Sequence, residues 1–123
     1  MSTRFSTTID DPATPRFLAD LLKARDVTTI DGEAEVMPGV TLFPTPDHSP
    51  GQVSLQLEAD EGPVVLAADA LKTAREALSG IPDMEIDPQK RGRASIAEIL
   101  RRGRTIVPGH FPTIHREVDG RLW

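Results

Sequence analysis

The sequence contains no cysteine and no tyrosine, and aromatic residues make up only 4% of its 123 residues. Without cysteine the chain can form no disulfide framework, thiolate metal site or cysteine nucleophile, so any metal would have to sit on histidine and carboxylate side chains. It has no apolar run of about 18 residues, which argues against a membrane-spanning helix. The first residues, Met1-Ser-Thr-Arg-Phe5, lack the apolar stretch of a signal peptide. We therefore expect a cytoplasmic protein with no membrane partner.

Positive charge is also in short supply. Fourteen Lys and Arg residues stand against 19 Asp and Glu residues, and the resulting net charge of −5 opposes general attraction to phosphate backbones. Basic residues do cluster over 90–104, but acidic residues flank and interrupt them, and aromatic side chains that could stack on bases are scarce. We predict that the chain binds no nucleic acid and that this cluster is a solvated helix face.

Length and composition indicate a single globular domain. A hydrophobic content of 38% in 123 residues is sufficient for one core. Residues 1–13 show no apolar periodicity and are expected to form a flexible N-terminus. Residues 14–123 are expected to form the domain.

Apolar periodicity and turn residues divide this domain into short elements. Alternating apolar residues mark strands, apolar residues three or four apart mark helices, and Gly and Pro mark the loops. The predicted helices cover residues 15–25, 70–78 and a segment that starts at either Asp87 or Ser95 and ends before Gly103. The predicted strands cover residues 27–30, 33–37, 40–43, 52–58, 64–68 and 105–107, and a terminal hairpin pairs 114–118 with 121–123 around Asp119-Gly120.

Two of the three histidines and one aspartate follow predicted strands. His48 lies in a proline-rich loop, Asp69 directly follows the apolar strand 64–68, and His110 ends the turn after the strand 105–107. The ends of neighbouring strands gather at one edge of a sheet, and imidazole and carboxylate groups are common ligands of divalent metals. We therefore predict that the three side chains converge on a common point. The plainer interpretation of either histidine is a polar loop residue.

Three segments carry a family resemblance: Thr45-Pro-Asp-His-Ser-Pro-Gly-Gln52, Val64-Val-Leu-Ala-Ala-Asp69 and Ile106-Val-Pro-Gly-His110. In this order they resemble the C-terminal half of the metallo-β-lactamase superfamily, and its lactonase-like branch in particular. The resemblance implies an α+β fold, namely a partial αββα sandwich in which this chain forms a mixed β-sheet with helices on one face. The family has glycine at the positions of Asp47 and Ala68, so the chain departs from the pattern there.

The resemblance also implies roles for the three candidate ligands. His48 is similar to the histidine that completes the first metal site, Asp69 to the carboxylate that bridges two metals and takes part in catalysis, and His110 to the last histidine of the second site. The family signature HxHxDH is absent, and residues 1–43 contain no histidine. The chain would therefore hold at most one divalent metal, with zinc as the expected ion. No family motif reaches His115, which is expected to be an ordinary strand residue.

Two functions remain open from the sequence. The first is a partial or divergent metal-dependent hydrolase of small lactone-type or ester-type substrates, with an incomplete metal site and little activity in the isolated chain. The second is a metal-free, non-catalytic remnant or interaction module of the same fold. A sheet with helices on one face leaves its other apolar face uncovered. This predicts either a homodimer or a complementing chain that carries the N-terminal half.

Overall fold

The computed structural model of the protein describes residues 13–25, 28–117 and 119–123. The N-terminal segment that we expect to be flexible lies almost wholly outside the described residues. The chain divides into two compact units, residues 1–31 and 32–123. Within the described ranges, no helix combines the length and the apolar character needed to cross a membrane.

The described part of the first unit holds one helix, α1 (Ala13–Lys23). It corresponds to the helix predicted over 15–25. The sequence also predicts a strand over 27–30, of which residue 27 lies outside the described residues. Residues 28–30 are exposed and form no strand, so the prediction is wrong there. β-branched residues favour a strand where a neighbouring strand offers hydrogen bonds, and the sheet of this protein begins only at β1, after Gly32.

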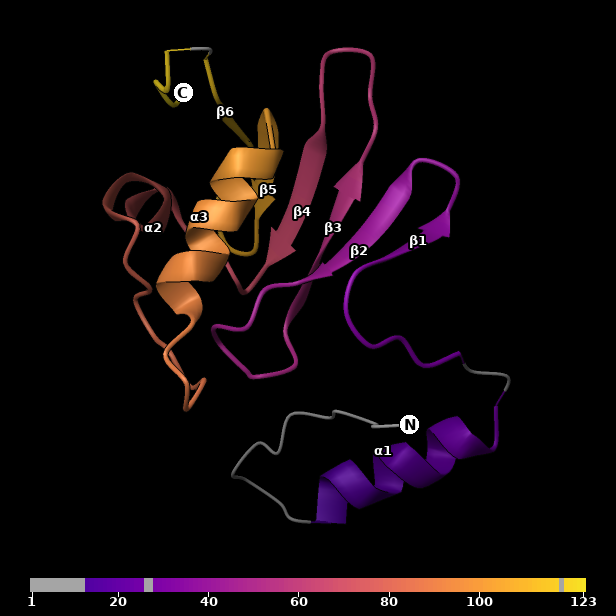
Figure 1. The fold of residues 1–123 in the computed structure, drawn as a ribbon. Coiled ribbons are helices and arrows are strands. Elements are labelled where there is room, and N and C mark those ends of the chain that lie inside the picture. Colours follow the sequence, from indigo (N-terminus) through magenta and orange to yellow (C-terminus); the bar gives the residue numbers. More distant parts are fainter. Residues whose placement is uncertain (1–12, 26–27, 118) are drawn as a thin grey trace. The chain divides into compact units, whose positions relative to one another are not determined.

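The second unit is built on one mixed β-sheet whose six strands lie in chain order (Figure 1). Its strands are β1 (Ala34–Met37), β2 (Val40–Pro44), β3 (Val53–Leu57), β4 (Val64–Ala68), β5 (Thr105–Pro108) and β6 (Ile114–His115). Neighbouring strands are antiparallel except β4 and β5, which run parallel. The predictions for these strands agree with the structure, and the mixed sheet is confirmed.

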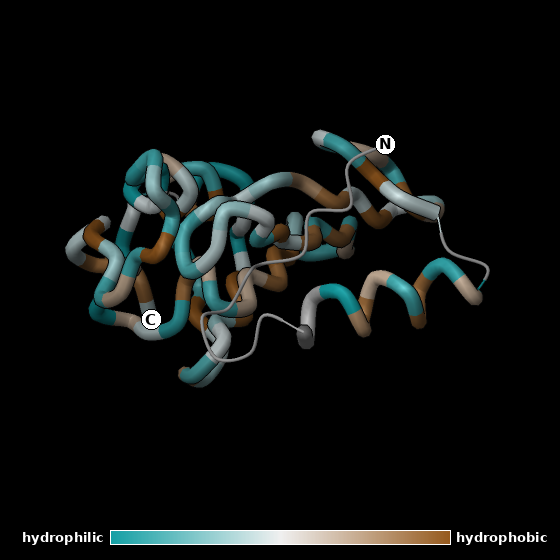
Figure 2. Tube along the Cα trace, turned by 90° about the horizontal axis from the view of Figure 1, so that it is seen from below, coloured by the Kyte–Doolittle hydropathy of each residue, from teal (hydrophilic) through white to brown (hydrophobic). Residues whose placement is uncertain are grey.

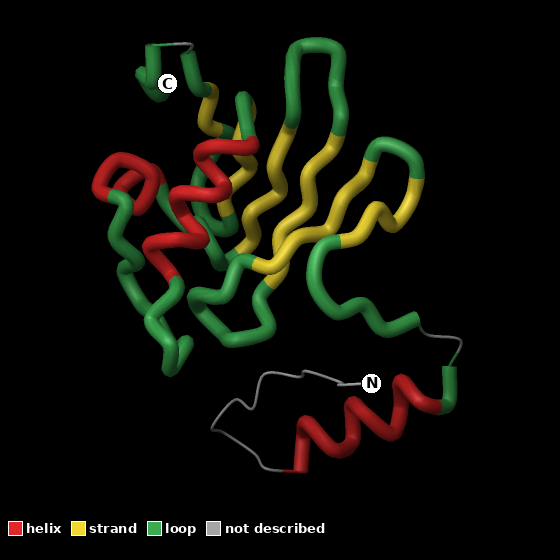
Figure 3. The backbone as a smooth tube through the Cα atoms, in the orientation of Figure 1, coloured by secondary structure: helices red, strands yellow, loops and turns green. Residues whose placement is uncertain are grey.

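Two helices connect β4 with β5: α2 (Ala74–Ser79) and α3 (Gly92–Arg102). α3 packs on β4 and α2 packs on α3, so both cover the same face of the sheet (Figures 1 and 3). α2 begins later than predicted because Thr73 caps it, with the Thr73 hydroxyl accepting the N–H of Glu76 at 3.4 Å.

α3 begins at Gly92, between the two starts that the sequence leaves open. The Asp87 side chain accepts the backbone N–H of Arg91 at 2.9 Å, which stabilises the turn before the helix. Ser95 is buried inside the helix, and its hydroxyl donates to the carbonyl of Pro46 at 2.7 Å. Ser95 therefore connects α3 with the loop after β2 instead of capping the helix.

The core of this unit lies between the sheet and the two helices. Val65 and Ala67 of β4 are fully buried, whereas Val64 and Leu66 belong to the opposite face and are half-buried. Figure 2 shows hydrophobic residues concentrated in the strands. The largest buried apolar side chains are Phe43, Leu71, Ile96, Ile99 and Ile106. Half-buried apolar residues that share the opposite face through the strand register are Leu42, Leu55, Leu57, Val64, Leu66 and Val107, which we call the apolar sheet face.

The predicted C-terminal hairpin is present, with His115 and Trp123 exchanging backbone hydrogen bonds of 2.7 and 3.0 Å. Its turn is not the two-residue type I′ turn that Asp119-Gly120 favours, because the N–H of Glu117 donates to the carbonyl of Arg121 at 2.8 Å. The N–H of Gly120 donates to the carbonyl of Glu117 at 2.9 Å, which gives a longer loop.

Candidate metal centre

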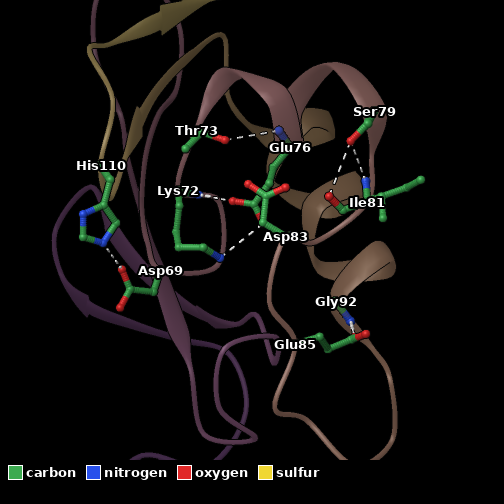
Figure 4. Close-up of polar contacts among 10 residues, drawn as sticks. All are labelled: Asp69, Lys72, Thr73, Glu76, Ser79, Ile81, Asp83, Glu85, Gly92 and His110. Atoms are coloured by element: carbon green, nitrogen blue, oxygen red, sulfur yellow. Dashed lines mark hydrogen bonds and ion pairs between the residues drawn. The ribbon is translucent and has the colours of Figure 1, made fainter.

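Asp69 and His110 meet at the edge of the sheet where β4 and β5 end. Because these strands are parallel, their C-terminal ends lie side by side, and the residues that follow them share one edge. Nε2 of His110 lies 3.0 Å from Oδ1 of Asp69 (Figure 4). The His110 and Asp69 side chains are 66% and 40% exposed. The structure thus brings together two of the three predicted metal ligands, and their exposed side chains are accessible to a metal ion or a small molecule.

Backbone contacts hold the two loops that carry this pair. The N–H of Gly109 donates to the carbonyl of Leu71 at 3.0 Å, and the N–H of His110 donates to the carbonyl of Lys72 at 2.9 Å. A Cβ atom at Gly109 would lie 2.5 Å from the carbonyl oxygen of Ala68, which is closer than non-bonded atoms approach. Glycine is therefore required for the two loops to lie this close together.

Ala68 is strained at the end of β4. Its φ of 48° lies in the left-handed region, which glycine adopts at little cost and alanine does not. The pairing of β4 with β5 also shifts between Leu66 and Ala68. The chain leaves the regular sheet at this point, immediately before Asp69.

His48 lies on a different loop, between β2 and β3. The loop is closed by the N–H of Thr45, which donates to the carbonyl of Gln52 at 2.9 Å. His48 is half-buried, and its Nδ1 is buried without a hydrogen-bond partner among the described residues. In the described ranges no three His, Cys, Asp or Glu side chains are grouped so that they could hold a metal. The structure therefore does not bring His48 into one such group with Asp69 and His110.

Asp47, the neighbour of His48, is fully buried, and neither of its carboxylate oxygens has a hydrogen-bond partner among the described residues. Burial raises the pKa of Asp47 to about 7, although the nearby ammonium of Lys72 acts to lower it. The backbone here is well held, since the Asp47 carbonyl accepts the N–H groups of Ile86 and Asp87, both at 3.1 Å. The departure from the family's glycine was the only signal that the sequence offered for this residue.

Lys72 and Glu76 form a polar cluster in the segment that follows Asp69 (Figure 4). Glu76 is fully buried and accepts the backbone N–H of Lys72 at 2.7 Å, the Lys72 ammonium at 3.3 Å and the backbone N–H of Asp83 at 3.0 Å. The sequence analysis missed this cluster, because a charged residue in a helix ordinarily faces solvent.

Asp87 is buried as well, but its carboxylate is fully bonded. Nε of Arg91 donates to Oδ2 at 2.8 Å and Nη2 of Arg91 donates to Oδ1 at 2.9 Å. The Arg91 guanidinium holds the pKa of Asp87 well below its usual range. Beside it, the N–H of Gly92 donates to the Glu85 carboxylate at 2.6 Å. Asp47 therefore differs from the acidic residues around it, which have hydrogen-bond donors.

His115 is separate from these clusters. It is half-buried on β6, its ring stacks on Trp123 with 4.4 Å between ring centroids, and its Nδ1 lies 3.4 Å from the Thr105 hydroxyl. As predicted, His115 lies half-buried in a strand.

Residues 4–110 match the sequence model of the metallo-beta-lactamase superfamily. The chain belongs to this superfamily. The match covers most of the chain and includes all three segments on which the resemblance was based.

Curated relatives within the superfamily include N-acyl homoserine lactonases. The lactonase from Bacillus thuringiensis is 43% identical over 61 residues, which are 49% of this chain and 24% of that protein. The lactonase from Bacillus cereus is 41% identical over 61 residues. The chain spans about a quarter of the length of these relatives.

Solved structures similar to this chain also include an N-acyl homoserine lactone hydrolase. An N-acyl homoserine lactone hydrolase with the product N-hexanoyl-L-homoserine bound at its catalytic metal center is 36% identical, has a TM-score of 0.57 and covers 67% of this chain and 34% of its own. A probable metal-dependent hydrolase from Staphylococcus aureus has a TM-score of 0.61 at 16% identity, over 75% of this chain and 36% of its own, and shows the fold alone. The α+β fold expected from the sequence is confirmed.

Membership of the superfamily implies a divalent metal, and the residues present fit one in part. Asp69 and His110 offer two donor types that zinc accepts, in contact with each other and exposed. His48 offers a third donor of a suitable type, whose buried Nδ1 lacks a partner among the described residues. The described chain thus supplies two converged donors and one separate donor.

Proposed function

We propose that this chain carries the Asp69–His110 part of a zinc site in a cytoplasmic hydrolase that opens lactone or ester bonds in a small molecule. The 3.0 Å contact between Asp69 and His110 carries the proposal. It supports a metal site because it presents a carboxylate and an imidazole from two loops at one exposed edge. The relatives named as N-acyl homoserine lactonases support the lactone class of substrate.

His48, Asp69 and His110 are the residues that would hold the metal, which when bound polarises a carbonyl group and lowers the pKa of a water molecule. Asp69 has a second role, because an exposed carboxylate can accept a hydrogen bond from the attacking water and orient it. His110 fixes the direction of that carboxylate through its contact with Oδ1.

We propose further that the metal site is incomplete in a single chain, which then holds at most one metal and has little activity alone. The sequence lacks HxHxDH and contains only three histidines. The missing ligands would come from a complementing chain that carries the N-terminal half, or from a second copy in a homodimer. The apolar sheet face supports such a partner, since apolar strand surface gains free energy when it is covered.

A metal-free, non-catalytic interaction module is the second candidate. It is favoured by one observation, namely that the described residues form no group of three side chains suited to a metal. In this case Asp69 and His110 would be a hydrogen-bonded surface pair, and the apolar sheet face would be the functional surface.

Metal analysis separates the two candidates. The protein is purified without added metal, dialysed against zinc, and compared with the His48→Ala, His110→Ala and His115→Ala variants. We expect bound zinc in the parent protein and in His115→Ala, the matched control, and a loss of at least tenfold in affinity in the other two variants. No zinc binding at any concentration, or equal binding in all variants, would favour the metal-free module.

A further inference from the structure

We propose that Glu76 is a positioning residue that holds the loop of His110 against the loop of Asp69. It acts through the peptide unit that joins Leu71 to Lys72. The inference rests on the proposed function, because it concerns how two of the predicted metal ligands are kept together. It is carried by hydrogen bonds on both sides of this one peptide.

The peptide between Leu71 and Lys72 is bonded at both ends. Its N–H, which belongs to Lys72, donates to Oε1 of Glu76 at 2.7 Å. Its carbonyl, which belongs to Leu71, accepts the N–H of Gly109 at 3.0 Å. A peptide unit is planar and trans, so its N–H and carbonyl point in opposite directions from one rigid group. A carboxylate that accepts the N–H also polarises the carbonyl and strengthens the second bond.

The next carbonyl along the chain continues this contact into the candidate site. The carbonyl of Lys72 accepts the N–H of His110 at 2.9 Å, and Nε2 of His110 lies 3.0 Å from Oδ1 of Asp69. Two successive carbonyls of one loop thus hold two successive amides of the other. A shift of the first carbonyl therefore moves both amides, and with them the imidazole of His110.

Glu76 can fix this peptide because its own side chain is held in place. It is fully buried, and its carboxylate accepts two further donors, the Lys72 ammonium at 3.3 Å and the N–H of Asp83 at 3.0 Å (Figure 4). Its backbone N–H donates to the hydroxyl of Thr73, the N-cap of α2. A buried carboxylate with several charge-assisted hydrogen bonds has little freedom to rotate.

The simpler alternative is that Glu76 only caps α2. The segment Thr73-Ala-Arg-Glu76 has the spacing of a capping box, in which the Glu side chain accepts the N–H of the cap residue. Here the carboxylate reaches past the cap to the N–H of Lys72, and also to the N–H of Asp83 beyond the end of the helix. These two bonds hold segments outside α2, which a helix cap does not require.

Hydrogen exchange in the metal-free protein separates the two roles. In Glu76→Ala we expect the amides of Gly109 and His110 to lose about tenfold in protection, as for the loss of one hydrogen bond. The loss is measured relative to the amide of Gly103, which is held within α3 and reports overall stability. A loss confined to the amide of Gly80, which donates to the Glu76 carbonyl at 2.8 Å, would overturn the proposal.

Lys72→Met is the matched control for the role of the peptide. It removes the ion pair with Glu76 but keeps the N–H that donates to Oε1. Relative to Gly103, we expect the amides of Gly109 and His110 to keep their protection to within about threefold. A loss as large as that in Glu76→Ala would overturn the proposal, since the ion pair and not the peptide would then hold the loop.

Glu76→Gln covers the case in which Glu76→Ala does not fold. Glutamine keeps one oxygen for the N–H of Lys72, but its NH₂ group faces the donors that the carboxylate accepts. An uncharged oxygen is the weaker acceptor, so we expect a loss of about fivefold at Gly109 and His110. Protection equal to that of the parent protein at both amides would overturn the proposal.

A titration with Co²⁺, followed by its visible absorption, connects the inference to the metal. We expect Glu76→Ala to weaken Co²⁺ binding about tenfold. Ile99→Val, which loses stability in the core on α3, should bind Co²⁺ as the parent protein does. Equal affinity in Glu76→Ala and the parent would overturn the positioning role. If the parent protein binds no Co²⁺, the proposed function fails, and the exchange measurements still decide whether Glu76 holds the loop of His110.

Discussion

The loops after β4 and β5 differ from the loop between β2 and β3 in how they hold their candidate ligands. Asp69 and His110 are exposed, touch each other, and stand on loops fixed by the Gly109 and His110 amides. His48 lies beside Asp47, whose buried carboxylate has no hydrogen-bond donor among the described residues, and the Nδ1 of His48 likewise has no partner among them. The first region is built from contacts within this chain, whereas the second contains polar groups that those contacts leave unsatisfied.

This contrast indicates which region of the chain needs a further group to satisfy its buried polar side chains. Buried polar groups are nearly always hydrogen-bonded in native proteins, so Asp47 and His48 mark the region where a metal or a partner chain would have most effect. The Asp69–His110 edge needs no such addition to keep its geometry. Substitutions in the two regions should therefore behave differently, and three of them test the comparison.

Gly109→Ala should have the largest effect. The new Cβ would lie 2.5 Å from the carbonyl oxygen of Ala68 and 3.0 Å from Oδ1 of Asp69, so the two loops would have to separate. We expect a loss of about 3 kcal/mol in the free energy of unfolding, measured in urea, together with loss of the Asp69–His110 contact.

Gly80→Ala is the control for that experiment. Gly80 has φ 71° and no atom within 4 Å of the Cβ position, so its substitution costs only the backbone strain, about 1 kcal/mol. If Gly109→Ala costs no more than Gly80→Ala, the loops of the exposed edge are less constrained than the structure indicates.

The exposed edge could be foreseen from the sequence for a physical reason. β4 and β5 are short, apolar and bounded by turn residues, and parallel strands necessarily place Asp69 and His110 at one edge. The connection between β4 and β5 was also foreseeable, because a parallel pair needs a long crossover and the segment between them has helical spacing.

The buried loop could not be foreseen in the same way. Whether Asp47 is buried depends on packing against α3, where Ser95 holds the Pro46 carbonyl, and such contacts between distant segments leave no periodic pattern. Glu76 resembles a solvated helix residue until the backbone amides of Lys72 and Asp83 are seen to converge on it. Local pattern predicts elements, but the ionisation and partners of buried acids follow from tertiary packing.

Asp87→Asn should have an intermediate effect, on the side of the buried loop. Asp87 anchors that loop because its N–H donates to the Asp47 carbonyl at 3.1 Å, while its carboxylate accepts three donors from Arg91. Loss of these charge-assisted bonds to a buried carboxylate should cost about 2 kcal/mol at pH 7. Urea unfolding of the variant and of Asp119→Asn, an exposed control paired with Arg121, measures the difference.

The effect of Asp87→Asn should also depend on pH. The folded pKa of Asp87 lies below its unfolded value of about 3.9, so its stabilisation is complete above that value and is lost as pH falls through the lower, folded pKa. The gap between parent and variant should therefore be constant from pH 7 to about pH 5 and should narrow below about pH 4. A gap that widens on acidification would contradict the role of Arg91 as its partner.

Ala68→Gly should have the smallest effect and the opposite sign. Ala68 is exposed, so its methyl group contributes little packing, and its φ of 48° is strained for any residue with a Cβ. Glycine removes that strain but gains conformational freedom in the unfolded state, and we expect a net stabilisation of about 0.5–1 kcal/mol. Ala97→Gly, at an exposed position inside α3, is the matched control and should destabilise by about the same amount. If the two substitutions change the stability with opposite signs, the backbone at the exposed edge is strained directly before Asp69. Destabilisation by both would mean that the Ala68 methyl group holds the chain in place as it leaves β4, and that the exposed edge depends on this side chain as well as on its backbone bonds.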